Sequence, residues 1–315
     1  MKILLPALME ILQVVTILAA APAFVGWIRT VKCWFQGRTT PGILQPYQDL
    51  RKLFSKDVVL AENASWIFRF TPYLVFGVMV LMAGIVPILS TDLLLTATAD
   101  VIALVALLAI ARFFTALAGM DVGTAFGGMG SSREMMIASL AEPAMLMAIF
   151  TVSLIGQSTS LSEIGKVILE GGFALRPSMV FAFLAFVLIF LAETGRIPVD
   201  NPATHLELTM IHEAMILEFS GRHLALLEWA GMVKLTLFTA IGIVLFFPWG
   251  ISPTADPIWL PLVLIALILK LAVIGAGVVL VELSLAKMRL FRVPEFLGTA
   301  FLFATLGMIS FFTLE

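Results

Sequence analysis

The stretch AETGRIPVDNPATHLELTMIHEAMILEFSGRHLALLE, residues 192–228, concentrates titratable groups in an otherwise apolar chain. It holds acidic residues, two arginines and all three histidines of the protein, namely Glu193, Asp200, Glu207, Glu213, Glu218, Glu228, Arg196, Arg222, His205, His212 and His223. The chain as a whole is 61% hydrophobic. Titratable side chains inside a membrane protein are costly, and by default they mark ion or proton pathways. This stretch is therefore the centre of the predicted site.

The composition predicts an all-α, polytopic integral membrane protein. The mean hydropathy is +1.07, and only 13% of the 315 residues are charged. Several apolar runs exceed the ~18 residues that indicate a spanning helix. The alternating pattern of a membrane barrel is absent, and no basic stripe indicates nucleic acid. With Cys33 as the one cysteine, the chain cannot build an iron–sulfur cluster or a thiolate zinc site. If the protein takes part in redox chemistry, the cofactors belong to its partners.

The apolar segments predict eight spans in a single membrane domain, residues 1–315, because no linker divides them. The predicted spans are Leu4–Ile28, Pro72–Leu89, Ala97–Ala118, Met135–Ile155, Pro177–Ala192, His223–Phe247, Ile258–Glu282 and Pro294–Phe312. The loops after the odd-numbered spans contain thirteen Lys and Arg residues, against three on the other side. Positive residues favour the cytoplasm. We therefore predict both termini in the periplasm of a bacterial inner membrane, with cytoplasmic loops at about 29–71, 119–134 and 196–222.

Two cytoplasmic loops have recognisable patterns. In the first, apolar residues from Ile43 to Phe54 fall at helical spacing with charges between them, which predicts an amphipathic helix at the membrane surface. This helix is either a surface anchor or the floor of a docking surface for a soluble partner. The second loop, GMDVGTAFGGMGSSRE from Gly119, predicts a tight and irregular backbone, with Ser131 and Ser132 capping a helix that begins near Arg133.

Charged residues also fall inside the predicted spans. Glu142, Glu228, Lys234 and Lys270 lie deeper, whereas Arg112 and Glu282 lie nearer the cytoplasmic ends, where long side chains can reach the surface. One charge at a helix centre costs ~2.5–3.5 kcal/mol on insertion scales, so several together need partners or water. Two readings stay open: ion pairs that tie helices together, or a hydrated file of groups that passes protons.

The three histidines do not match the spacing of a zinc motif. His205 and His212 are seven residues apart, and no histidine follows His212-Glu213 at the position that a zincin motif requires. Histidine titrates near neutral pH. A hydrogen-bonding or proton-relay role is therefore favoured over a metal site.

Five motifs resemble one known family. They are PGILQPYQDLRKL from Pro41, ARFFTALAGMDVGTAFGGMGSSRE from Ala111, AEP from Ala141, AETGRIPVD from Ala192 and EFSG from Glu218. They resemble the complex I subunit 1 (H subunit) family, and within it the membrane subunits of group 4 [NiFe] hydrogenases, of the formate hydrogenlyase and hydrogenase-4 type. The glycine-rich block and the Glu142-Pro143 pair favour the hydrogenase branch. The sequence departs from the family at Arg38-Thr39, where two arginines are usual, and this leaves a quinone-site role unsupported.

The resemblance implies a non-catalytic subunit that anchors a soluble redox arm and joins it to antiporter-like membrane subunits. The implied partners are the [NiFe] large subunit and the iron–sulfur small subunit, which carry the cofactors. Partner contacts are expected at Arg38, Pro41, Gly42, Gln45, Pro46, Asp49, Lys52, Arg133, Arg196 and Pro198. A proton path is expected through Glu142, Glu193, Asp200, Glu207, Glu213, Glu218, Glu228, Lys234, Lys270, His205 and His212. The alternatives are a quinone-chamber subunit of a complex I-type enzyme and a stand-alone ion transporter.

Overall fold

The computed structural model describes residues 4–95, 100–170, 176–200, 210–252 and 256–314, and these residues are almost entirely helical. Apart from two isolated bridges, no β-structure occurs in these ranges. The helices are α1 Leu4–Phe35, α2 Gln45–Phe54, α3 Trp66–Ile85, α4 Val101–Asp121, α5 Ala125–Gly156, α6 Leu161–Glu170, α7 Pro177–Glu193, α8 His212–Ile216, α9 Gly221–Phe246, α10 Leu260–Ser284 and α11 Val293–Leu314. Short 3-10 turns at Pro257–Trp259 and Leu290–Arg292 precede α10 and α11.

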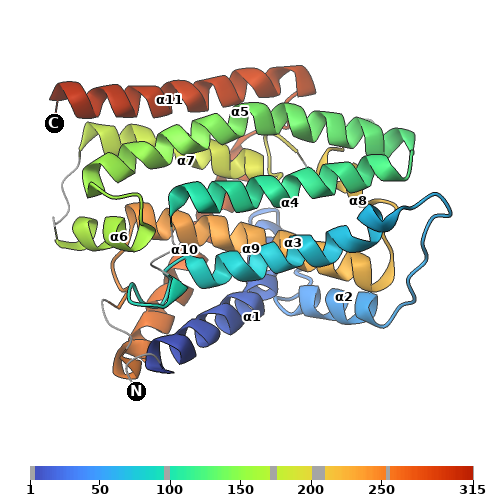
Figure 1. Ribbon diagram of the computed structural model, residues 1–315, viewed down its shortest axis with the longest axis horizontal. Helices are drawn as coiled ribbons and strands as arrows, with labels where there is room; N and C mark the ends of the chain where they lie inside the picture. Colours follow the sequence, from blue (N-terminus) through green and yellow to red (C-terminus); the bar gives the residue numbers. More distant parts are fainter. Residues whose placement is uncertain (1–3, 96–99, 171–175, 201–209, 253–255, 315) are drawn as a thin grey trace.

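The prediction of an all-α membrane fold is confirmed. Seven of the described helices (α1, α3, α4, α5, α9, α10 and the segment ending with α11) are long and apolar enough to cross a membrane. The fifth predicted span corresponds to α7, an apolar helix of 17 residues, or ~25 Å at 1.5 Å per residue. The long helices run side by side, and α1 begins at the same end of the molecule at which α11 ends (Figure 1). This arrangement fits an even number of crossings.

The predicted amphipathic helix is also present, as α2, and it packs against α1 and α9. Its partner α1 contains Pro22, which has no N–H to donate to the carbonyl of Leu18. The indole N–H of Trp229, in α9, donates to that carbonyl at 3.1 Å. The hydroxyl of Tyr47, in α2, donates to the carbonyl of Ala19. Side chains of α2 and α9 therefore donate hydrogen bonds to backbone carbonyls of α1 in the turn that precedes its proline.

Two predicted helix starts are wrong. The second span begins at Trp66, not at Pro72, because the side chain of Ser65 caps the helix by accepting from the N–H of Ile67. The predicted loop 119–134 is mostly helix, since α5 begins at Ala125 after Thr124 accepts from the N–H of Gly127. The capping role predicted for the two serines near Arg133 is therefore also wrong.

Two glycines at the start of α5, Gly127 and Gly130, serve close packing. A Cβ on Gly127 would lie 2.1 Å from the carbonyl oxygen of Gly119, in α4. A Cβ on Gly130 would lie 2.9 Å from the carbonyl oxygen of Ile211, which precedes α8. Contacts below 3.0 Å do not occur for real Cβ atoms, so only glycine lets α5 approach α4 and α8 this closely. These two glycines therefore belong to a helix-packing surface and not to a loop.

A pair of adjacent glycines tests this packing. Gly127→Ala should destabilise the fold, because the new methyl group meets backbone that cannot move aside. Gly128→Ala is the matched control, since nothing lies within 4 Å of its Cβ position, and alanine favours helix over glycine by about 0.5–1 kcal/mol. Thermal unfolding in detergent should show a lower midpoint for the first variant and an unchanged or higher one for the second. Equal midpoints would contradict the packing role.

Candidate functional site

The candidate site is organised around Arg112, in the middle part of α4. Its guanidinium contacts three carboxylates: Nη1 lies 2.8 Å from Oε1 of Glu142, Nε lies 3.5 Å from Oε1 of Glu134, and Nη2 bonds Oε2 of Glu193. Arg112 is 7% exposed. The sequence-based expectation that its side chain reaches the membrane surface is therefore wrong, because three acidic partners hold it inside the protein.

The carboxylates come from helices that meet at α4. Glu134 and Glu142 are eight residues apart in α5, which places them on one face of the helix about two turns from each other. Glu193 is the last residue of α7. Sequence reasoning singled out two of the three and missed Glu134. The eight-residue spacing was the signal that could have found it.

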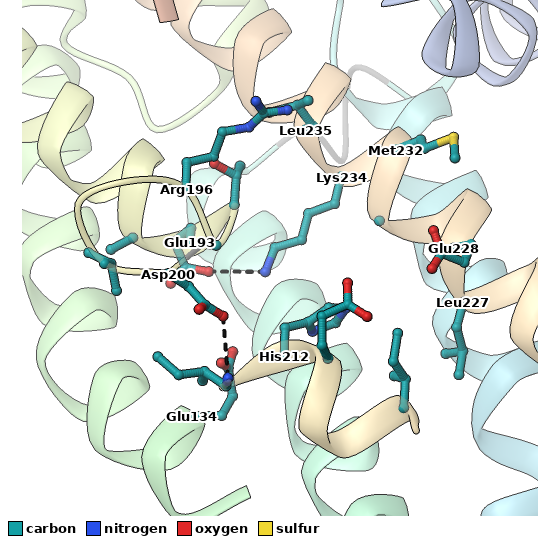
Figure 2. A pocket seen from close by; sticks show the side chains of 18 of the residues that line it. Glu134, Glu193, Arg196, Asp200, His212, Leu227, Glu228, Met232, Lys234 and Leu235 are labelled. Carbon is teal, nitrogen blue, oxygen red and sulfur yellow. Dashed lines mark hydrogen bonds and ion pairs between the residues drawn. The ribbon is translucent and has the colours of Figure 1, made fainter. Parts of the chain in front are cut away.

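A second cation reaches Glu193 from α9. Nζ of Lys234 lies 3.3 Å from Oε2 of Glu193, and Figure 2 shows the two side chains pointing at each other. The Glu193 side chain is 2% exposed. Its other oxygen, Oε1, is buried without a hydrogen-bond partner among the described residues. Glu193 thus combines two cationic partners with a spare acceptor position.

A cavity of about 190 Å³ lies next to this network. Glu134, Glu193 and Lys234 line it, together with polar residues from the turn after α7, from α8 and from α9, including Arg196, Asp200, His212, Glu213 and Glu228 (Figure 2). A water needs roughly 10–15 Å³ of such volume and two to four polar partners. The cavity therefore has the size and lining to hold several waters against the carboxylates.

A second charged group borders the cavity. Oε1 of Glu282, in α10, lies 2.7 Å from Nη1 of Arg196, and Oε2 lies 2.8 Å from Nζ of Lys32, in α1. Nearby, Oδ1 of Asp200 lies 3.3 Å from Nζ of Lys287. The Glu282 side chain is only 4% exposed. The expectation that it reaches the membrane surface is wrong as well, because two partly buried cations pair with it and cover it.

The other residues of the predicted proton path are dispersed. Lys270 donates to the carbonyls of Phe247 and Trp249, beyond the far end of α9 from Glu228, and does not line the cavity. Glu218 is exposed and also lies outside the cavity lining. His205 and Glu207 lie outside the described residues.

The residues predicted to contact partners have mixed surroundings. Arg38, Pro41, Gly42 and Lys52 are exposed, whereas Pro46 is buried. Gln45 donates to Asp49 at 3.0 Å, and Arg29 lies 3.7 Å from the same carboxylate. Arg133 donates to the carbonyl of Met210 at 3.0 Å. The carbonyl of Pro198 accepts from the N–H of Met288 at 2.9 Å. The exposed members lie in the segment between α1 and α3, while the last two hold internal turns in place.

Comparison with known proteins gives consistent matches along the whole chain. The family described as NADH dehydrogenase matches residues 8–313. Formate hydrogenlyase subunit 4 of Escherichia coli (strain K12) is 32% identical over 96% of this chain and 98% of its own. Hydrogenase-4 component C of the same organism is 31% identical over 96% and 94%. A chain in the structure of the membrane-bound sulfane sulfur reductase, an archaeal respiratory membrane complex, superposes with a TM-score of 0.84 at 21% identity, covering 96% of this chain and 98% of that one.

The arrangement around Arg112 leads to a stability prediction. Arg112→Met should leave three carboxylates without their main cation, the buried Glu193 among them, and breaking a buried ion pair in this way costs about 3–5 kcal/mol. The control is Lys166→Met, because Lys166 pairs with Glu163 on the surface and such pairs contribute about 0–1 kcal/mol. We expect much lower yield and a lower unfolding midpoint in detergent for the first variant only. Similar behaviour of both variants would show that Arg112 is not the organising cation.

Proposed function

The chain belongs to the NADH dehydrogenase family, that of complex I subunit 1 (H subunit), and on this basis we propose that it is the membrane anchor and proton-coupling subunit of a group 4 membrane-bound [NiFe] hydrogenase complex. The formate hydrogenlyase or hydrogenase-4 type is proposed because two subunits with those names match nearly the whole chain. The observation that carries the coupling role is an ion-pair network beside a polar cavity. Arg112 and Glu193 are its buried centre, and Glu134, Glu142 and Lys234 complete it.

In this proposal the network passes on a change of charge. The three carboxylates share one guanidinium, so a proton that arrives on one of them weakens its attraction to Arg112 and alters what the other two experience. Lys234 adds a second cation at Glu193 only. Protonation at the cavity side is thereby linked to Glu142, which lies deeper in α5. A change of charge at one carboxylate is thereby transmitted to the other two through Arg112.

The proposed path begins in the cavity and leads into the helix layer. His212, Glu213 and Glu228 line the cavity and can exchange protons with water there. Glu193 and Lys234 form the next step, and Arg112 connects them to Glu142. Lys270 falls outside this path, because its ammonium group bonds backbone carbonyls beyond the far end of α9.

The redox chemistry is assigned to partner subunits. The [NiFe] centre and iron–sulfur clusters would be held by the large and small soluble subunits, docked on the cytoplasmic segments at about 29–71 and 196–222. Antiporter-like subunits would contact the helices within the membrane.

The chain would lie in a bacterial inner membrane with periplasmic termini, in agreement with its positive-inside pattern. A reporter enzyme fused after Glu315 tests this orientation, and cytoplasmic activity of that fusion would contradict it.

A quinone-chamber subunit of a complex I-type enzyme is the second candidate, because the matching family is described as NADH dehydrogenase. The two functions differ in what the intact complex does with its electrons. Hydrogen evolution by the purified complex supports the hydrogenase assignment. NADH-dependent quinone reduction without hydrogen evolution supports the alternative. A stand-alone transporter requires ion movement by the isolated chain without any partner.

Glu142 provides the mutational test. Glutamine keeps the size of this side chain but cannot take up or release a proton. Glu142→Gln should leave the complex assembled, since Arg112 keeps two other carboxylates, and should leave hydrogen evolution from a soluble dye nearly unchanged. Activity coupled to the membrane gradient should fall severalfold or more.

Glu163→Gln is the matched control, because it removes the charge of an exposed glutamate in α6 that pairs with Lys166. It should change neither activity. Loss of assembly in Glu142→Gln would make the residue a structural member of the ion-pair network. Normal assembly together with an undiminished gradient would exclude Glu142 from the path.

A further inference from the structure

Glu282 is a buried carboxylate on a helix, α10, that also has a strongly exposed apolar face. Along α10, Ile265, Leu269 and Val273 are each at least 65% exposed. Glu282 is instead enclosed by Lys32 of α1 and Arg196 of the turn after α7. Taking a carboxylate and its partners out of water gains little or no net stability compared with apolar packing. A role in holding a particular geometry is therefore a better explanation of Glu282 than stability alone.

The geometry in question is that of residues 193–200, here called the cavity-side turn. Arg196 lies at its centre: its N–H donates to the carbonyl of Leu191 at 2.9 Å, and its carbonyl accepts from the N–H of Val199 at 2.9 Å and of Asp200 at 3.2 Å. Gly195 has φ of +60°, a left-handed conformation that glycine adopts without strain. The position of Arg196 therefore governs where the residues on either side of it point, Glu193 among them.

The end of α10 and the segment that follows it hold this turn at three points. Glu282 bonds the guanidinium of Arg196. The N–H of Met288 donates to the carbonyl of Pro198 at 2.9 Å, and Nζ of Lys287 lies 3.3 Å from Asp200. Of the three contacts, the first is the most buried, and it lies closest along the turn to Glu193. The Glu282–Arg196 pair therefore links α10 to the network of Arg112, because Arg196 is only three positions after Glu193.

We infer that Glu282 is a positioning residue: it fixes Arg196 and the cavity-side turn, and thereby holds Glu193 in register with Arg112 and Lys234. The inference rests on the proposed function for its effect on coupling, but not for its effect on structure. Lys32 serves as the comparison, because it is the other partner of the same carboxylate and belongs to α1, not to the turn.

The experiment uses the intact purified complex and two readouts. Amide hydrogen exchange followed by mass spectrometry measures the order of the cavity-side turn, and proton uptake per hydrogen evolved in proteoliposomes measures coupling. Glu282→Gln and Arg196→Met should each speed exchange of the turn by about tenfold or more, because each removes the buried ion pair that ties the turn to α10. Lys32→Met should leave exchange within about twofold, and Glu282→Asp, which keeps the charge, should restore most of the protection.

Each outcome decides one part of the inference. Unchanged amide exchange of the turn in Glu282→Gln overturns the positioning role, whatever the proton-uptake measurement gives. Faster exchange with unchanged proton uptake overturns the link to coupling. Faster exchange with a loss of proton uptake, in the Glu282 and Arg196 variants but not in Lys32→Met, supports both parts. A wild-type complex that moves no protons refutes the proposed function, while the exchange data still decide whether Glu282 positions the turn. If Glu282→Gln does not assemble, Glu282→Asp and Arg196→Met carry the same comparison.

Discussion

A guanidinium placed among membrane-spanning helices has to be paired, and this requirement shapes the centre of the molecule. An unpaired charge at such a depth costs several kcal/mol, roughly 2.5–3.5 on insertion scales. Arg112 is paired with carboxylates from α5 and α7, and Lys234 of α9 forms an ion pair with one of them, Glu193. The helices α4, α5, α7 and α9 therefore converge on one point. The glycines at the start of α5 allow the close contacts that bring Glu134 and Glu142 to α4.

The two buried charge groups have opposite imbalances. Around Arg112, three carboxylates face two cations, whereas around Glu282 one carboxylate faces two cations. The cavity-side turn joins the groups, since Glu193 belongs to the first and Arg196 to the second. Movement of this turn changes the surroundings of both residues together. A turn with this position is well suited to connect an event in the polar cavity with groups inside the helix layer.

The sequence predicted the fold well because its main signals are local. Runs of apolar residues identified the spans, and helical periodicity identified α2. The glycine run was misread, since a glycine that permits close packing looks the same in sequence as one that forms a loop. The pairing of Glu142 and Glu193 with Arg112 was missed for a related reason. Glu142 lies 30 residues and Glu193 lies 81 residues from Arg112 in the sequence. Whether such distant helices meet is decided by tertiary packing, which the sequence pattern does not reveal. Only the Glu134 and Glu142 spacing offered a local signal.

The central claim is that the carboxylates around Arg112 act as one unit in coupling. The most direct measurement is a double-mutant cycle on proton uptake per hydrogen evolved, in proteoliposomes containing the intact complex with Glu142→Gln, Glu193→Gln or both. Residues in one network give non-additive effects, whereas independent sites give additive ones. The account predicts that the double variant loses no more coupling than the more impaired single variant. Losses that add in free-energy terms would show two separate routes and contradict it.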